Sequence, residues 1–155
     1  MMMRLTCNVL RVLKGKTLVT AESCTGGGIG AALTAIPGSS EVYKGGVISY
    51  TNWVKENVLG VDREVLAQFG AVSAQVAQAM AEGVRKYLDA DVAVSVTGLA
   101  GPGGDDFGNP VGTVYIGYCD GNKSYARKYF FSGDRETVRQ KAILAALELV
   151  LQENE

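Results

Sequence analysis

The sequence predicts a single α/β domain of three layers, in which a mixed β-sheet has helices on both faces. Helix-like and strand-like segments alternate through the first two thirds of the chain, which is typical of parallel strands joined by crossover helices. Nearer the C-terminus, the strand-like segments Gly112–Cys119 and Tyr125–Phe131 flank Asp120-Gly121, a pair typical of a β-hairpin. The length of 155 residues fits one domain better than two.

The N-terminal part of the chain predicts a helix, a strand and a second helix in turn. Apolar residues at helical spacing predict the first helix over Met3–Leu13, and the Lys-Gly-Lys of residues 14–16 ends it. The β-rich run Thr17–Glu22 predicts a short buried strand. The glycine-rich turn Ser23–Gly30 then opens a helix of small residues that continues to about Thr34.

The middle of the chain predicts a second strand and three helices. The strand covers Gly45–Tyr50, and two short helices start at Thr51 and Asp62. Ser73 is a residue type that commonly caps a helix N-terminus. The long helix behind it carries one apolar stripe, formed by Val76, Met80, Val84 and Leu88.

The last third predicts a central strand, a long loop, the hairpin and a final helix. Asp91–Thr97 alternates valines with small residues and is therefore read as the central strand. The segment Gly98–Pro110 is rich in glycine and proline, and loops of this length are usually functional or mobile. The final helix starts near Asp134, and its inward-facing residues are Val138, Ala142, Ala145, Ala146 and Leu149.

Polar side chains follow three of the predicted strands at the point where each strand ends. They are Glu22-Ser23, Ser49-Tyr50 and Thr97, which a glycine-rich loop follows. Ligand sites in parallel sheets lie beyond the carboxyl ends of the strands. We therefore expect the functional site at these three strand ends.

Composition excludes several classes of function. The chain has no histidine, which excludes a Ser-His-Asp triad, a Cys-His dyad, a histidine base and a histidine-ligated metal within one chain. The formal net charge of -1 argues against a nucleic-acid-binding module. Three scattered cysteines favour a reducing compartment. Because neither a membrane-spanning apolar run nor a signal peptide is present, we expect a soluble cytoplasmic protein without a membrane partner.

Ser23 has two interpretations that the residues alone leave open. Capping serines are far commoner than nucleophiles, so frequency favours Ser23 as the N-cap of the next helix. The functional interpretation is a nucleophile on a tight turn, with the amides of Gly26–Gly28 near the path of attack on a carbonyl. The glycines do not form a P-loop, because GxxxxGK[ST] is absent, and an NTPase is a poor candidate.

Tyr50 and Lys55 lie five residues apart, across the end of the second predicted strand. As an isolated pair they are most simply a half-buried aromatic residue and a solvated lysine. In a chain without histidine, however, a lysine in a water-poor pocket loses proton affinity and can act as a base near neutral pH. A tyrosine can relay or orient the proton, and lysine-activated serines are an established alternative to the histidine triad.

Several other residues are candidates for supporting roles. Cys24 is a rival nucleophile, although a small buried cysteine that packs the helix is the favoured interpretation. Glu22 either orients the site or merely ends a strand. The loop Thr97–Gly104 offers backbone amides and a hydroxyl that can cradle an anion. Arg135 and Arg139, one turn apart, are candidate phosphate ligands, unless they are solvated or paired with neighbouring acids.

Five motifs follow one another along the chain: Thr20–Gly27 (TAESCTGG), Gly70–Ser73 (GAVS), Ser95–Pro102 (SVTGLAGP), Pro110–Val114 (PVGTV) and Phe131–Arg135 (FSGDR). Together they resemble the CinA C-terminal domain family, which includes bacterial nicotinamide-nucleotide amidohydrolases. The resemblance extends from about Leu5 to Leu151. In longer members this domain follows a molybdopterin-binding-like domain, for which 155 residues leave no room, so we expect a stand-alone domain over residues 1–155.

The resemblance implies hydrolysis of the carboxamide of nicotinamide mononucleotide to nicotinate mononucleotide and ammonia, without a metal or an organic cofactor. It implies that Ser23 is the nucleophile and that Tyr50 and Lys55 are its catalytic partners. The amides of Gly26–Gly28 or of Gly98–Gly101 are the candidate oxyanion donors. The expected substrate-binding residues are Gly26, Gly27, Thr97, Gly98, Gly101, Arg135 and Arg139.

Two other classes of function remain as alternatives. One is a catalytically silent nucleotide-binding or regulatory domain linked to competence or DNA damage. The other is an interaction protein in DNA uptake or repair, against which the near-neutral charge counts. For the enzyme we expect a homo-oligomer whose partner is the small-molecule substrate and not a nucleic acid.

Overall fold

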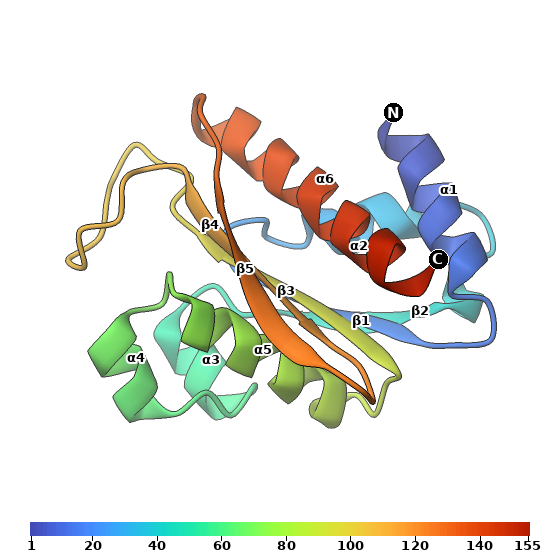
Figure 1. Ribbon diagram of the computed structural model, residues 1–155, viewed down its shortest axis with the longest axis horizontal. Coiled ribbons are helices and arrows are strands. Elements are labelled where there is room, and N and C mark those ends of the chain that lie inside the picture. The colour runs from blue at the N-terminus through green and yellow to red at the C-terminus, as the bar shows by residue number, and fades with distance from the viewer.

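The computed structural model describes all residues from 1 to 155 and contains one five-stranded sheet (Figure 1). Its strands are β1 (Leu18–Glu22), β2 (Tyr43–Ile48), β3 (Val92–Gly98), β4 (Thr113–Cys119) and β5 (Ser124–Phe130). They lie in the order β2-β1-β3-β4-β5. β1 is parallel to β2 and β3, whereas β4 is antiparallel to both of its neighbours, so the sheet is mixed as predicted.

Helices cover both faces of this sheet and give the predicted three layers (Figure 1). The helices are α1 (Met2–Val12), α2 (Gly28–Thr34), the 3-10 turn η1 (Ser39–Glu41), α3 (Asn52–Asn57), α4 (Arg63–Phe69), α5 (Ala74–Tyr87) and α6 (Arg135–Asn154). α1, α2 and α6 lie on one face, and α3, α4 and α5 lie on the other (Figure 1). None of these helices combines the length and the apolar composition that a membrane-spanning helix requires.

Three helices begin at the positions that the sequence predicts, because each has a side-chain cap. Asp62, Ser73 and Asp134 precede α4, α5 and α6, and each accepts a hydrogen bond from a backbone N–H in the first turn. Such caps satisfy N–H groups that have no partner within the helix. The starting points of α4, α5 and α6 are therefore fixed by local chemistry.

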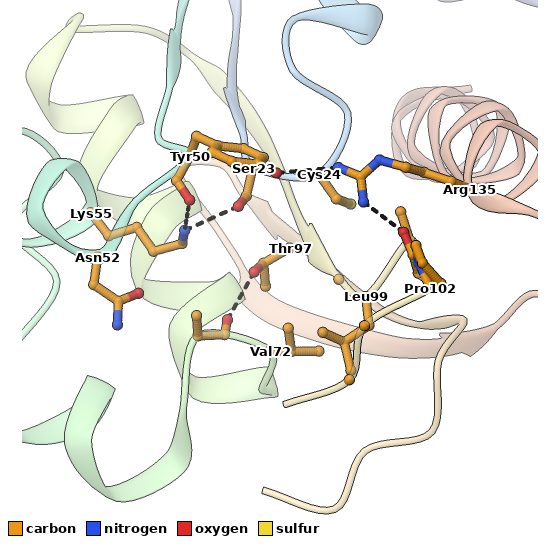
Figure 2. Close-up of a pocket in the computed structure, with 16 residues that line it drawn as sticks. Ser23, Cys24, Tyr50, Asn52, Lys55, Val72, Thr97, Leu99, Pro102 and Arg135 are labelled. Atoms are coloured by element: carbon orange, nitrogen blue, oxygen red, sulfur yellow. Dashed lines mark hydrogen bonds between the residues drawn. The ribbon is translucent and has the colours of Figure 1, made fainter. Parts of the chain in front are cut away.

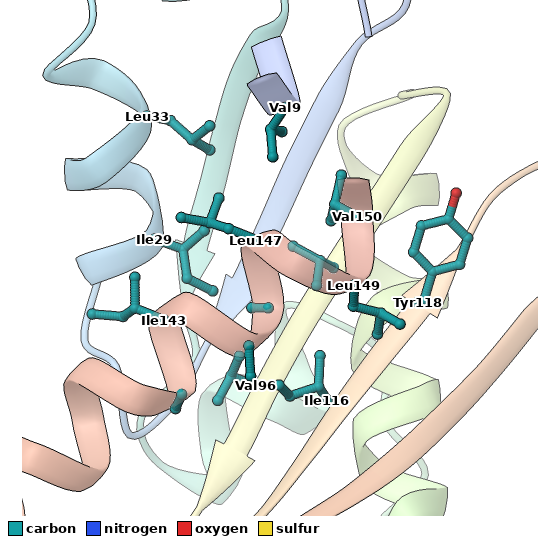
Figure 3. Packing of buried hydrophobic residues seen from close by; sticks show 14 of the residues in the cluster. Val9, Ile29, Leu33, Val96, Ile116, Tyr118, Ile143, Leu147, Leu149 and Val150 are labelled. Carbon is teal, nitrogen blue, oxygen red and sulfur yellow. The ribbon is translucent and has the colours of Figure 1, made fainter. Parts of the chain in front are cut away.

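Two apolar clusters hold the layers together. The larger lies between the sheet and α1, α2 and α6, where Val96 and Ile116 of the sheet pack with Ile143, Leu147 and Val150 of α6 (Figure 3). The smaller lies between the sheet and α5. β1 and β3 contribute to both clusters, so these two central strands are buried on both faces. Their carboxyl ends are consequently a rigid base for a site.

β2 is displaced from its predicted range of Gly45–Tyr50. It begins at Tyr43, which pairs with Leu18 of β1, and it ends at Ile48, which pairs with Glu22. Its length is set by pairing with the short strand β1, and residue pattern alone does not carry that information. Ser49 and Tyr50 therefore lie beyond the strand end, where the backbone is free to turn toward α3.

The topology gathers four chain segments at one edge of the sheet. β1, β2 and β3 are parallel, so their carboxyl ends meet there. β5 is antiparallel to β4, which is antiparallel to β3, so β5 also ends at this edge. The first turn of α6 follows β5 directly and is placed beside the three parallel strand ends.

Candidate active site

A cavity of about 390 Å³ lies where β1, β2 and β3 end (Figure 2). Its volume is within the range of small-molecule sites. The first residue of α6, the residues before α5 and the loop after β3 complete its walls. The lining residues are Ser23, Cys24, Tyr50, Asn52, Lys55, Ala71, Val72, Thr97, Gly98, Leu99, Ala100, Gly101, Pro102, Gly103, Gly104 and Arg135.

The buried side chains of Ser23 and Lys55 meet in this cavity (Figure 2). The Nζ atom of Lys55 is 3.0 Å from Ser23 Oγ, and it donates to the backbone carbonyls of Ser49 at 2.7 Å and Tyr50 at 3.3 Å. A neutral amine has two N–H groups for the two carbonyls, which leaves its lone pair for the hydroxyl proton of Ser23. The two carbonyls thus hold Nζ with its remaining position toward Ser23, which is the geometry that a base requires.

Burial sets the proton affinity of this lysine. Lys55 is 1% exposed, and desolvation of its charged form lowers its pKa from 10.5 to about 8. No carboxylate lies against the amine to offset this effect, since no acidic residue lines the cavity. A substantial fraction of Lys55 is therefore neutral at slightly alkaline pH, as a general base requires.

The turn that carries Ser23 is not the first turn of a helix. α2 begins at Gly28, and its N-cap is Gly27 with φ of 98°, so Ser23 does not cap the helix. The N–H groups of Gly26 and Gly28 donate to Ser23 and Thr25 carbonyls within the turn. These two amides are consequently occupied, and they do not line the cavity.

Other backbone amides in the cavity are available to a negative oxygen. Cys24 follows Ser23 directly, and Ala100 and Gly101 belong to the loop after β3. The N–H groups of these three residues have no acceptor within the protein. The loop Gly98–Gly101 is therefore the better of the two predicted oxyanion donor segments, together with the amide of Cys24.

Cys24 is a poorer nucleophile than its position beside Ser23 suggests. Its side chain is buried and packs in the larger apolar cluster. Desolvation raises the pKa of its thiol from 9.0 to about 11. Because the thiolate is the reactive form, a thiol with this pKa is inert near neutral pH.

The backbone carbonyl and the side-chain hydroxyl of Tyr50 bind different partners. Its carbonyl accepts from Lys55, whereas its hydroxyl accepts from Arg135 Nη2 at 3.2 Å. Arg135 Nη1 also donates to the carbonyl of Gly101 at 2.7 Å, which ties α6 to the loop after β3 (Figure 2). Lys55 therefore reaches Ser23 directly, and the Tyr50 hydroxyl is oriented toward Arg135 instead.

The structure brings together most, but not all, of the predicted substrate-binding residues. Thr97, Gly98, Gly101 and Arg135 line the cavity with the three predicted catalytic residues. Gly26, Gly27 and Arg139 do not line it. The guanidinium of Arg139 donates instead to the carbonyls of Cys24 at 3.0 Å and Thr25 at 3.3 Å.

Sequence reasoning missed the contribution of Asn52 and of Ala71-Val72 to the cavity. Asn52 is the first residue of α3, one turn before Lys55, so both side chains lie on the same side of that helix. That spacing was a usable signal. Ala71 and Val72 carry no chemical signal, because only the tertiary fold brings the residues before α5 against the end of β3.

Comparison with known proteins identifies the family. The CinA C-terminal domain matches residues 3–154, which is nearly the whole chain. The chain belongs to the CinA C-terminal domain family. A CinA-like protein of Thermotoga neapolitana is 46% identical over 142 residues, which are 90% of this chain and 35% of that protein. A CinA-like protein of Endomicrobium trichonymphae is 50% identical over 135 residues, or 87% of this chain and 32% of that protein. The chain thus spans about a third of the length of these relatives.

Solved structures share the fold over nearly their whole length. The competence damage-inducible protein A (ComA) from Klebsiella pneumoniae has 38% identity and a TM-score of 0.94, covering 98% of this chain and 96% of that one. The competence/damage inducible protein CihA from Agrobacterium tumefaciens has 38% identity and a TM-score of 0.92, covering 99% and 96%. The three-layer architecture of this CinA C-terminal domain is therefore that of its relatives.

The buried lysine of this CinA C-terminal domain predicts a pH-dependent stability. Between pH 8 and 10.5 the unfolded chain holds a proton on Lys55 that the folded chain has lost, so the free energy of unfolding rises with pH across this window. Below pH 8 both states hold the proton, and the folded state bears the full desolvation penalty. We expect the unfolding free energy of the wild type, relative to Lys55→Met, to rise by about 3 kcal/mol from about pH 7.5 to about pH 10.5. Urea unfolding of both proteins measures it, and a constant difference would show that Lys55 keeps its ordinary pKa.

Proposed function

We propose that this chain hydrolyses the carboxamide of nicotinamide mononucleotide, giving nicotinate mononucleotide and ammonia. The observation that carries the proposal is the buried Ser23–Lys55 pair, with 3.0 Å between Oγ and Nζ and a lysine pKa of about 8. Such a pair supplies a nucleophile and a base without histidine. Membership of a family that includes amidohydrolases of this kind supports the choice of an amide substrate.

In the first half of the reaction, Ser23 becomes acylated. Neutral Lys55 takes the hydroxyl proton as Ser23 Oγ bonds to the carboxamide carbon. The negative oxygen of the tetrahedral intermediate accepts from the free amides of Cys24, Ala100 and Gly101, each worth about 3 kcal/mol in the transition state. The C–N bond then breaks, Lys55 returns its proton to the departing nitrogen, and ammonia leaves a nicotinoyl ester on Ser23.

The second half hydrolyses this ester along the reverse proton path. Lys55, neutral again, takes a proton from a water molecule that attacks the ester carbon. When the C–O bond to Ser23 breaks, Lys55 gives that proton to Oγ. One base thus serves both halves, and no metal or organic cofactor takes part in either step.

The charge of the cavity suits the anionic nucleotide. Arg135 and Lys55 are its only charged lining residues, and both are basic. Lys55 is engaged with Ser23, whereas Arg135 uses one N–H for Gly101 and one for Tyr50 and keeps three of its five N–H groups for the phosphate. Arginine binds phosphate oxygens in a two-pronged geometry, and neighbouring glycine amides of the loop after β3 can add donors.

Replacing the nucleophile tests the centre of the proposal. Ser23→Ala should lower ammonia release from nicotinamide mononucleotide by at least about 1,000-fold, because no other group forms the ester. The unfolding free energy should change by only about 1 kcal/mol. Cys24→Ala is the matched control and should retain most of the turnover. Near-normal turnover in Ser23→Ala together with an inactive Cys24→Ala would identify the thiol as the nucleophile.

The pH profile tests the base. Only neutral Lys55 accepts a proton, so kcat/KM should rise with pH through an ionisation at about 8 and level off above it. Lys55→Arg keeps the charge but does not deprotonate, and it should be nearly as inactive as Lys55→Ala. The exposed Lys44 supplies the control, since Lys44→Arg should leave turnover unchanged. An active Lys55→Arg with an unaltered pH profile would exclude Lys55 as the base.

Two substrates test the phosphate site. Arg135→Ala should raise KM for nicotinamide mononucleotide by at least about tenfold and change KM for nicotinamide riboside much less, because only the mononucleotide carries a phosphate. Arg63→Ala, at an exposed position on α4, should alter neither value. Equal losses for both substrates would mean that Arg135 acts through its bonds to Tyr50 and Gly101 alone.

A further inference from the structure

Glu22 is a buried carboxylate directly before the proposed nucleophile, and the proposed mechanism gives it no role. Its side chain is 2% exposed and contacts the first turn of α2. Oε1 accepts from Thr25 Oγ1 at 2.7 Å and from the N–H of Ile29 at 2.8 Å. Oε2 accepts from the N–H of Gly30 at 3.0 Å and from Thr20 Oγ1 at 3.2 Å. Both oxygens are therefore fully used in binding the turn to the first residues of α2.

Arg139 holds the same turn from the opposite element, α6. Its Nε and Nη2 donate to the carbonyls of Cys24 and Thr25, and its Nη1 is paired with Glu136 at 2.8 Å. Cys24 and Thr25 are the two residues directly after Ser23. The guanidinium thus binds two backbone carbonyls of the turn, while Glu22 binds the Thr25 hydroxyl of the turn and ties it to the first N–H groups of α2.

We propose that Glu22 and Arg139 are positioning residues that hold the turn Ser23–Thr25 in its reactive geometry. Two quantities depend on this turn: the 3.0 Å approach of Ser23 to Lys55 and the direction of the free N–H of Cys24. A displacement of about 1 Å in a reacting group lowers a rate by about 100-fold. The role rests on the proposed function, in that Ser23 is taken as the nucleophile.

This role differs from the phosphate ligand that sequence alone assigns to Arg139. Two of its three donor nitrogens already bind backbone carbonyls of the turn, and the third binds Glu136. Arg135, four residues earlier, lines the cavity in its place. The two arginines therefore have different positions: Arg135 lines the cavity, and Arg139 binds the turn that carries Ser23.

The first test replaces Glu22 by its isosteric amide. In Glu22→Gln an NH₂ group replaces one accepting oxygen and faces donors, so the turn must shift. Turnover of nicotinamide mononucleotide should fall by about 100-fold while KM changes by less than about threefold. The rate at which phenylmethanesulfonyl fluoride labels Ser23, read by mass spectrometry, should fall in parallel, and this readout needs no nucleotide.

A matched control separates positioning from general destabilisation. Ser95 is equally buried, and its hydroxyl donates to the carbonyl of Ala77 in α5, away from the turn. Ser95→Ala should lower the melting temperature and leave turnover and labelling within about twofold of the wild type. Unchanged labelling in Glu22→Gln, or an equal loss in Ser95→Ala, would overturn the proposal. A wild type that neither labels at Ser23 nor releases ammonia would instead refute the proposed function.

The second test uses Arg139→Met and decides the question even where Glu22→Gln does not fold. A positioning role lowers kcat for nicotinamide mononucleotide and nicotinamide riboside by the same factor, with little change in KM, and slows labelling of Ser23. A phosphate-binding role raises KM for the mononucleotide alone and leaves labelling unchanged. The second result would overturn the assignment of Arg139 to the turn.

Discussion

The site depends on one amine that the fold keeps away from water. Lys55 is the buried residue of α3, its Nζ is held by the carbonyls of Ser49 and Tyr50, and its remaining hydrogen-bonding position faces Ser23. An exposed lysine would be protonated and mobile, and it would carry neither the direction nor the proton affinity of a base. The two residues directly after β2 supply both carbonyls, so the geometry of the amine follows from where that strand stops.

The mixed sheet explains why so many segments meet at this point. Parallel pairing brings the ends of β1, β2 and β3 together, and the antiparallel hairpin then returns the chain so that β5 ends at the same edge. An all-parallel sheet would need another crossover helix to reach that edge. The hairpin returns the chain to that edge with a short turn. α6 then starts with Arg135 in the cavity, and Arg139, one helical turn later, binds the turn that carries Ser23.

The sequence was sufficient for the layers, for the starts of α4, α5 and α6 and for the meeting of three strand ends, because these follow from periodicity and from capping residues such as Ser73. It was insufficient where the outcome depends on a partner distant in sequence. The limits of β2 depend on pairing with β1, and the separate roles of Arg135 and Arg139 depend on how α6 lies over the turn after β1. The role of Glu22 could not be predicted for the same reason, because the path of the glycine turn decides which N–H groups of α2 reach its carboxylate. The family resemblance, and not the residue pattern, favoured the interpretation of Ser23 as a nucleophile over its interpretation as a helix cap.

In the proposed reaction, desolvation favours Ser23 over the adjacent Cys24 as the nucleophile. Removing water from a lysine disfavours its charged form and lowers its pKa, whereas removing water from a thiol disfavours the thiolate and raises its pKa. The same buried environment therefore brings Lys55 to about 8 and takes Cys24 to about 11. A serine needs no prior ionisation when a neutral amine accepts its proton during attack. Burial at the end of β1 thus favours a neutral amine at Lys55 and a protonated thiol at Cys24, and this supports Ser23 as the nucleophile of the proposed reaction.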